Sequence, residues 1–96
     1  MKVIVFDTTI EIRYVSEADW CDEDTYGDFD HKQMLIRIVK NMNFDQYWNT
    51  LIHELSHVRQ FLYGLPMCEN EANRDALFLY SLLKKHLPSL EQMKYT

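Results

Sequence analysis

Residues His53-Glu54-Leu55-Ser56-His57 spell H-E-x-x-H, the pattern that most restricts how this chain can fold. In a helix, side chains four positions apart lie on one face, so His53 and His57 can bind the same metal ion. Glu54 is then directed toward the open side of that ion. The motif therefore predicts a helix that carries two zinc-binding imidazoles and a carboxylate placed to act as a base.

The residues around the motif support this helix. Asn43 is predicted as its N-cap, Gln46 completes a capping box, and Gly64 follows the expected C-terminal end. Because the motif histidines lie roughly opposite part of the apolar stripe, both rings are expected to face away from that core contact. The stripe itself consists of Phe44, Trp48, Leu51, Leu55, Val58 and Leu62.

The remaining sequence predicts an α+β fold. Strand patterns cover residues 3–6, 10–15 and 33–39, and a second helix is expected from near Asn70 to about His86. The stretch from Glu17 to Asp30 is acidic, has no Lys or Arg, and is expected to be a surface loop. We therefore expect one domain over residues 1–96, with a short antiparallel sheet of about three strands packed on two helices.

Composition excludes several classes of partner. The net charge is −5 and the ten Lys and Arg residues are scattered, so no nucleic acid is expected as a ligand. The apolar run at the N-terminus ends at Asp7, which is too early for a membrane segment. Cys21 and Cys68 form no C-x-x-C pair, so we expect reduced thiols and a cytoplasmic protein.

A hydrolytic zinc site usually has three protein ligands and one open position, so the motif needs a further ligand. Glu71, near the start of the second helix, is the favoured third ligand, and Glu69 is the alternative. Asp75 lies one turn after Glu71. Its carboxylate is expected to accept the outer N–H of His53 and so to fix the orientation of that ring.

The motif and the segment Glu69-Asn70-Glu71-Ala72-Asn73-Arg74-Asp75 resemble the gluzincin metallopeptidases, and most closely the ImmA/IrrE-type peptidases of bacteria, mobile elements and phages. The resemblance covers about residues 33–83. It implies a zincin-like fold with Zn²⁺ as cofactor, held by His53, His57 and Glu71 with Asp75 behind them. It also implies a peptidase that hydrolyses peptide bonds through a zinc-bound water, with Glu54 as general base.

Two other functions stay open. One is a catalytically weak or inactive zincin-fold protein that binds a partner and uses zinc structurally, and the other is an SprT-like DNA-associated peptidase, which the acidic charge disfavours. The expected substrate is a protein or peptide, such as a regulatory protein. If residues 33–39 form an exposed edge of the sheet, the substrate can add there as an extra strand. The candidates for a transition-state donor are Tyr26, His31, Tyr63, Tyr80 and His86.

Overall fold

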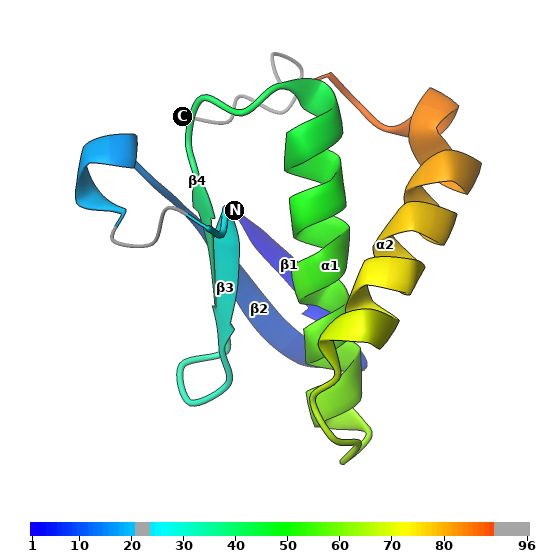
Figure 1. Cartoon of the computed structure of the whole chain (residues 1–96). Helices are drawn as coiled ribbons and strands as arrows, with labels where there is room; N and C mark the ends of the chain where they lie inside the picture. The colour runs from blue at the N-terminus through cyan, green and yellow to red at the C-terminus, as the bar shows by residue number, and fades with distance from the viewer. Residues whose placement is uncertain (21–23, 90–96) are drawn as a thin grey trace.

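The computed structural model describes residues 1–20 and 24–89 of the chain. These residues contain four strands and two helices, joined by turns and loops. The α+β class is confirmed, and Figure 1 shows α1 between the sheet and α2. Two short 3-10 turns cover Glu17–Asp19 and Lys84–His86. The main elements are β1 (Lys2–Val5), β2 (Thr8–Val15), β3 (Gly27–Asp30), β4 (Leu35–Val39), α1 (Phe44–Leu62) and α2 (Glu69–Leu83).

The sheet has the strand order β1-β2-β4-β3 and mixed strand directions. β2 runs parallel to β4, whereas the β1–β2 and β3–β4 pairs are antiparallel. The expected antiparallel sheet of about three strands is therefore wrong in both number and direction. The additional strand, β3, comes from the acidic stretch that was expected to be a loop. Its Asp28 lies opposite Arg37 of β4, and the two side chains form an ion pair.

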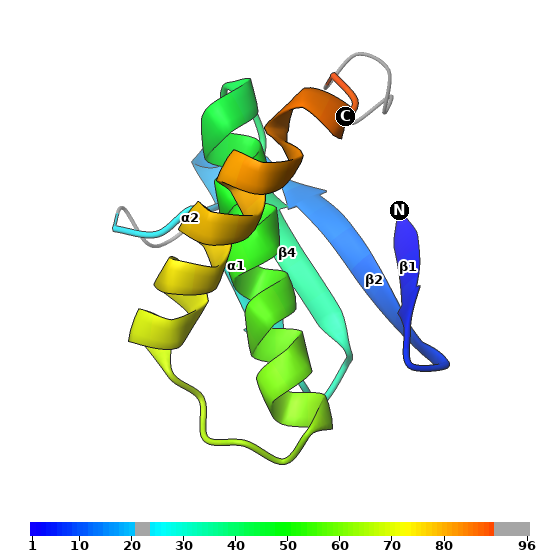
Figure 2. The same ribbon diagram turned by 90° about the vertical axis from the view of Figure 1, so that its right-hand side faces the viewer.

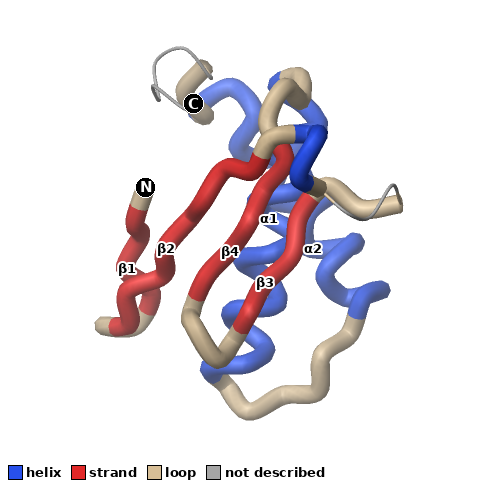
Figure 3. The backbone as a smooth tube through the Cα atoms, turned by 90° about the vertical axis from the view of Figure 1, so that its left-hand side faces the viewer, coloured by secondary structure: helices blue, strands red, loops and turns tan. Residues whose placement is uncertain are grey.

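The core lies between one face of the sheet and α1, and Figure 3 shows both helices behind the sheet. Alternate positions of the two central strands provide Ile10, Ile12, Ile36 and Ile38, all of them buried. From α1, the buried side chains of Tyr47, Leu51 and Val58 pack against them. Each such side chain contributes about 1.5–3 kcal/mol through removal of apolar surface from water. This packing fixes which face of α1 meets the sheet. It therefore also fixes the direction in which the side chains of the H-E-x-x-H motif point.

Local signals position the ends of α1 as the sequence predicts. The Asn43 side chain accepts a hydrogen bond from the backbone N–H of Gln46 at 2.9 Å, and the Gln46 side chain accepts from the N–H of Asn43 at 3.2 Å. Both halves of the capping box are thus confirmed. After the helix, Gly64 has a φ of 70°, in the left-handed region where glycine is favoured.

The second helix packs on α1 through small side chains. Ala72 and Ala76 are buried against α1, and Figure 2 shows α2 running alongside it. Small residues let two helix backbones approach closely, which brings the start of α2 near the motif. α2 ends at Leu83 rather than near His86, because residues 84–86 form a 3-10 turn.

No helix within the described ranges is both long and apolar enough to span a lipid bilayer. Cys68 is half-buried immediately before α2, and Cys21 lies outside the described residues. The reduced state of the two thiols stays a prediction.

Candidate metal centre

A cleft of about 1020 Å³ opens between α1, α2 and the segment that leads into β3. α1 contributes all three functional residues of the motif, His53, Glu54 and His57, to its wall. The prediction that the two rings turn away from the apolar stripe is therefore confirmed. α2 contributes Glu69 and Asn73 from the opposite side. The cleft thus has a polar wall on each of its two helices.

Three side chains converge at one point of this cleft. The Nε2 atom of His53 lies 3.0 Å from Oε2 of Glu69, and Nε2 of His57 lies 2.9 Å from Oε1 of the same carboxylate. The ligand atoms of the three residues all lie within 4.8 Å of one another. Two imidazole nitrogens and one carboxylate are the donor types of a hydrolytic zinc site.

His57 Nε2 is the atom whose surroundings point most directly to a cation. The side chain of His57 is only 8% exposed, and within the described part of the chain its Nε2 is a buried atom without a hydrogen-bond partner. Glu69 Oε1 is close to Nε2, but the two atoms do not have hydrogen-bond geometry. A buried polar atom normally has a partner, and a carboxylate facing a ring lone pair repels it. A metal ion between them would satisfy both groups.

Two of the three spacings between the donor atoms are close to those of a zinc site. Ligand atoms about 2.0–2.1 Å from a tetrahedral ion lie roughly 3.3 Å from one another. The two nitrogen–oxygen distances of 3.0 and 2.9 Å are a few tenths of an ångström shorter than that. Glu69 is 74% exposed, so its carboxylate can move outward to make room for the ion. In the metal-free chain, Glu69 Oε2 is within hydrogen-bond distance of His53 Nε2.

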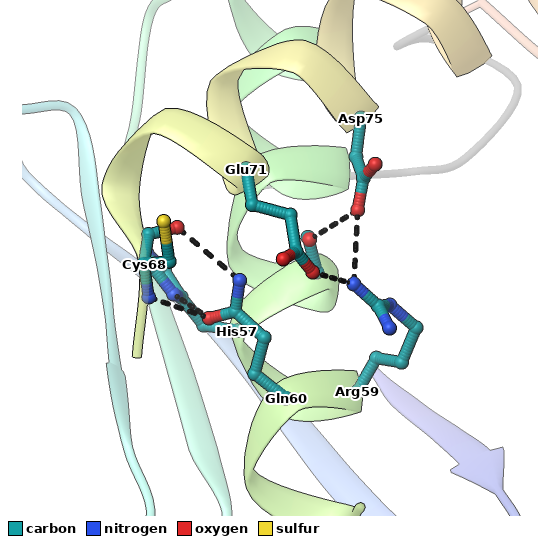
Figure 4. A network of polar contacts seen from close by, with 7 residues as sticks. His57, Arg59, Gln60, Cys68, Glu71 and Asp75 are labelled. Carbon is teal, nitrogen blue, oxygen red and sulfur yellow. Dashed lines mark hydrogen bonds and ion pairs between the residues drawn. The ribbon is translucent and has the colours of Figure 1, made fainter. Parts of the chain in front are cut away.

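The structure does not bring Glu71 and Asp75 to the histidine rings, contrary to the sequence-based assignment. Glu71 pairs with Arg59 of α1. Asp75 accepts a hydrogen bond from Ser56 Oγ at 2.7 Å and lies 3.3 Å from Nη2 of Arg59 (Figure 4). Neither carboxylate supports His53. In the structure they link α1 to α2, whereas Glu69, the alternative in the sequence analysis, lies beside both histidine rings.

The geometry of α2 explains this difference. Ala72 and Ala76 face α1, so residues on either side of that contact line project to opposite flanks of the helix pair. Glu69 and Asn73, which are one turn apart, line the cleft on one flank. Glu71 is two residues from Glu69, a rotation of about 200°, and therefore reaches Arg59 on the other flank. The ligand register depends on how the helices cross, which the spacing of acidic residues does not reveal.

Glu54 lies beside the three converging residues and is almost fully buried, with 6% of its surface exposed. This burial raises the pKa of its carboxyl from 4.5 to about 7. A proton added to the His57 ring would oppose this shift, whereas the carboxylates of Glu69 and Asp28 add to it. A carboxyl group with such a pKa can both accept and donate a proton near neutral pH, as a general base and acid must.

The strand β3 forms the side of the cleft next to Glu54. A Cβ atom at Gly27 would lie 2.8 Å from Cγ2 of Thr50 and 3.5 Å from Cγ of Glu54. The missing side chain therefore allows β3 to approach α1 beside the motif. Among the described strands β3 lies at the end of the sheet, whereas β4 has neighbours on both sides. The expectation that residues 33–39 offer a free edge to a peptide is wrong, because β2 and β3 occupy both edges of β4.

Of the five candidate transition-state donors, Tyr26 lines the cleft. The others are placed elsewhere in the fold: the Tyr63 ring packs at a tilt against Phe6, His31 stacks on Phe61, Tyr80 donates to Asp45, and His86 lies in the 3-10 turn after α2. The structure thus reduces the sequence-based set to one residue at the cleft.

Sequence reasoning missed two residues that shape this site, Gly27 and Gln60. Gln60 follows His57 by three positions, a spacing that places both on one helix face, and that spacing was a usable signal. For Gly27 the signal was the Asp30-His31-Lys32-Gln33 segment, in which Asp30 accepts backbone hydrogen bonds from Lys32 and Gln33. Such an Asp-centred turn is typical of a hairpin and would have indicated a strand before it.

Protein-family models, curated proteins and solved structures show no significant match to this chain.

Proposed function

We propose that this chain is a compact zinc-dependent peptidase with a minimal zincin fold, in which His53, His57 and Glu69 bind the metal. The observation that carries the proposal is the buried, unpartnered Nε2 of His57, which lies 2.9 Å from a Glu69 oxygen beside a second imidazole. The mixed sheet on a helix that bears H-E-x-x-H, followed by a helix that bears the third donor, supports the zincin assignment.

The residues of the cleft have distinct roles in this mechanism. His53, His57 and Glu69 would hold the ion at the wall of the cleft. Zinc bound there would lower the pKa of a water molecule toward ~7 and polarise the scissile carbonyl group. Glu54 accepts the proton of the attacking water and then delivers it to the leaving amine. Its position suits both steps, because the carboxyl group is buried in the wall of the cleft beside His53 and His57.

The proposed substrate is an exposed or unfolded protein segment, such as part of a regulatory protein. Because β3 is the end strand of the described sheet and borders the cleft, its free backbone groups can pair with an extended peptide. Backbone pairing fixes the position of a peptide without demanding one sequence. We also propose a reducing compartment, the cytoplasm, because the two cysteines form no paired motif.

A second candidate function is a zincin-fold protein that binds a partner and uses zinc structurally. The observation in its favour is the composition of the cleft, where among the described residues the one aromatic hydroxyl is that of half-exposed Tyr26. A donor so exposed to water would stabilise a transition state weakly. A DNA-associated peptidase is the less favoured reading, because a net charge of −5 repels phosphate groups.

Zinc content and cleavage of a flexible protein substrate, measured on the same samples, distinguish these functions. Glu54→Gln keeps the shape of the side chain and removes its basicity, so we expect bound zinc to be retained and the cleavage rate to fall by about 10²–10⁴-fold. Glu11→Gln is the matched control, because Glu11 is an exposed residue of β2 paired with Arg13, and it is expected to retain zinc and activity.

Each result has a defined meaning. Equal cleavage by the wild type and Glu54→Gln would contradict the catalytic role of Glu54. Stoichiometric zinc in a wild-type chain that cleaves nothing would favour the structural-zinc protein instead. A wild-type chain that binds no zinc would contradict both functions.

A further inference from the structure

Gln60 is a fully buried amide in the α1 helix, one turn beyond His57, and it has no part in the proposed chemistry. Its side chain makes three hydrogen bonds, which Figure 4 shows. Oε1 lies 2.9 Å from Nδ1 of His57 and 3.1 Å from the backbone nitrogen of Cys68. Nε2 donates to the carbonyl oxygen of Cys68 at 3.2 Å. A fully buried amide with all these bonds has one orientation.

The backbone of Cys68 determines that orientation. A peptide N–H can only donate and a peptide C=O can only accept, so Oε1 must face the Cys68 nitrogen and Nε2 must face the Cys68 oxygen. If the amide were turned over, Nε2 would face the Cys68 N–H, which places two donors together. Oε1 would then face the Cys68 oxygen, which places two acceptors together. Oε1 is therefore the atom next to His57, and an amide oxygen can only accept. It follows that Nδ1 of His57 carries a proton.

The state of the other ring nitrogen follows from this. In a neutral imidazole one nitrogen carries the proton and the other has a lone pair. With the proton of His57 held on Nδ1, the lone pair is on Nε2, the buried atom that faces Glu69. A metal ligand must present such a lone pair, and the group bonded to the opposite nitrogen decides which nitrogen presents it.

We infer that Gln60 is a positioning residue that fixes the His57 tautomer and joins two proposed metal ligands through one amide. The same oxygen that holds His57 also holds the N–H of Cys68, the residue immediately before Glu69. The start of α2, and with it the Glu69 carboxylate, is thus tied to the ring that it faces. The consequence for zinc rests on the proposed function, whereas the tautomer is a property of the metal-free chain.

The chain offers a matched control in the second link between the helices. Ser56 donates to Asp75, so this pair also joins α1 to α2, but it contacts neither ring of the proposed site. Ser56→Ala should therefore weaken the helix pair and leave the ligand tautomer unchanged. Any effect of Gln60 that Ser56→Ala lacks comes from the contacts of Gln60 with His57 and Cys68 and not from general loosening of the helices.

The experiment is nitrogen-15 NMR of the histidine rings in the metal-free chain, about two pH units above the usual histidine pKa of ~6.5. We expect His57 to carry its proton on Nδ1 in the wild type, in Ser56→Ala and in Gln60→Glu, because a carboxylate at position 60 still accepts. In Gln60→Met no acceptor remains, and we expect a signal shifted toward the Nε2–H tautomer.

Zinc affinity, measured by competition with a chromogenic chelator, gives the second readout. Gln60→Met is expected to weaken zinc binding about 10–100-fold, and Ser56→Ala to leave it unchanged. An Nε2–H tautomer in the wild type would overturn the inference, and this measurement does not depend on the stability of any variant. A folded Gln60→Met that keeps the wild-type tautomer and affinity would also overturn it. If the wild type shows the Nδ1–H tautomer but binds no zinc, the tautomer assignment stands and the proposed function is wrong.

Discussion

Replacing Gly27 with alanine is expected to destabilise the chain by forcing β3 away from α1. The new Cβ would lie 2.8 Å from Cγ2 of Thr50 and 3.0 Å from the carbonyl oxygen of Arg37. Carbon atoms in contact are normally about 3.5–4.0 Å apart, so the first contact requires a shift of several tenths of an ångström. The contact with Glu54 Cγ, at 3.5 Å, requires none.

The size of the effect follows from two opposing terms. Overpacking of a well-packed site costs about 1–3 kcal/mol. Alanine in a strand is favoured over glycine by about 0.5–1 kcal/mol, because the unfolded chain has fewer conformations to lose. The free energy of unfolding should therefore fall by roughly 0.5–2 kcal/mol. Thr50→Ser removes the clashing methyl group and keeps the hydroxyl, so it should restore part of this loss. The 3.0 Å contact with the Arg37 oxygen stays.

Urea unfolding of the wild type, both single variants and the double variant gives a double-mutant cycle. We expect Gly27→Ala to be less destabilising in the Thr50→Ser background, with a coupling energy of at least about 0.5 kcal/mol. Two effects that add within about 0.3 kcal/mol would refute the reasoning, because they would show that position 27 does not press on position 50. Unchanged m-values are required for this comparison.

The remaining predictions concern stability. Ile36→Val removes one methylene from a fully buried side chain and should lower the unfolding free energy by about 0.5–1.5 kcal/mol, whereas Leu77→Ala removes more atoms from a side chain that is 67% exposed and should change it by less than about 0.5 kcal/mol. Urea unfolding measures both, and the reverse order would contradict the assignment of the core. The hydrogen bond from Tyr80 and, to a lesser extent, the charge of Lys84 hold the pKa of Asp45 below its ordinary 3.8. The associated stability is therefore complete above pH 3.8 and is lost as the pH falls through the lower folded-state value. Thermal unfolding should show that the wild type loses more stability than Tyr80→Phe does when the pH is lowered below 3.8. Equal losses would contradict the assignment of the low pKa to the hydrogen bond from Tyr80.

The α1 helix could be predicted from sequence because its signals are local. The capping box of Asn43 and Gln46 and the left-handed Gly64 lie within a few residues of the ends that they define. His53 and His57 share a face for the same reason, since one helical turn separates them. These local signals are enough to predict the helix, its ends near residues 43 and 64, and the face that carries the two histidines.

The strand β3 could not be predicted in this way, because its stability comes from pairing. Asp28 of this acidic stretch lies opposite Arg37, nine positions later in the chain. Without that partner, Gly27-Asp28-Phe29-Asp30 is too short, and has too few apolar residues, for its alternation to distinguish a strand from a loop. The parallel pairing of β2 with β4 is likewise a property of the whole sheet.

The third donor of the site depends on tertiary structure in the same way. Glu69 and Glu71 both precede the buried Ala72, and their spacing along α2 is known from the sequence. Which of them reaches the histidines depends on the line of contact between α1 and α2. The pairing of Glu71 with Arg59 is the other consequence of that contact.

Zinc affinity of Glu69→Gln and Glu71→Gln tests the proposed metal centre most directly. The two substitutions make the same chemical change two residues apart on one helix, and both chains are compared with the wild type by chelator competition. Loss of Glu69 should weaken zinc binding by more than about 100-fold, because loss of a ligand exceeds the effect of its supporting residues. Loss of Glu71 should change it by less than about threefold, because its carboxylate pairs with Arg59 at a half-exposed position. Equal affinities for all three chains, or a larger loss for Glu71→Gln, would contradict the site.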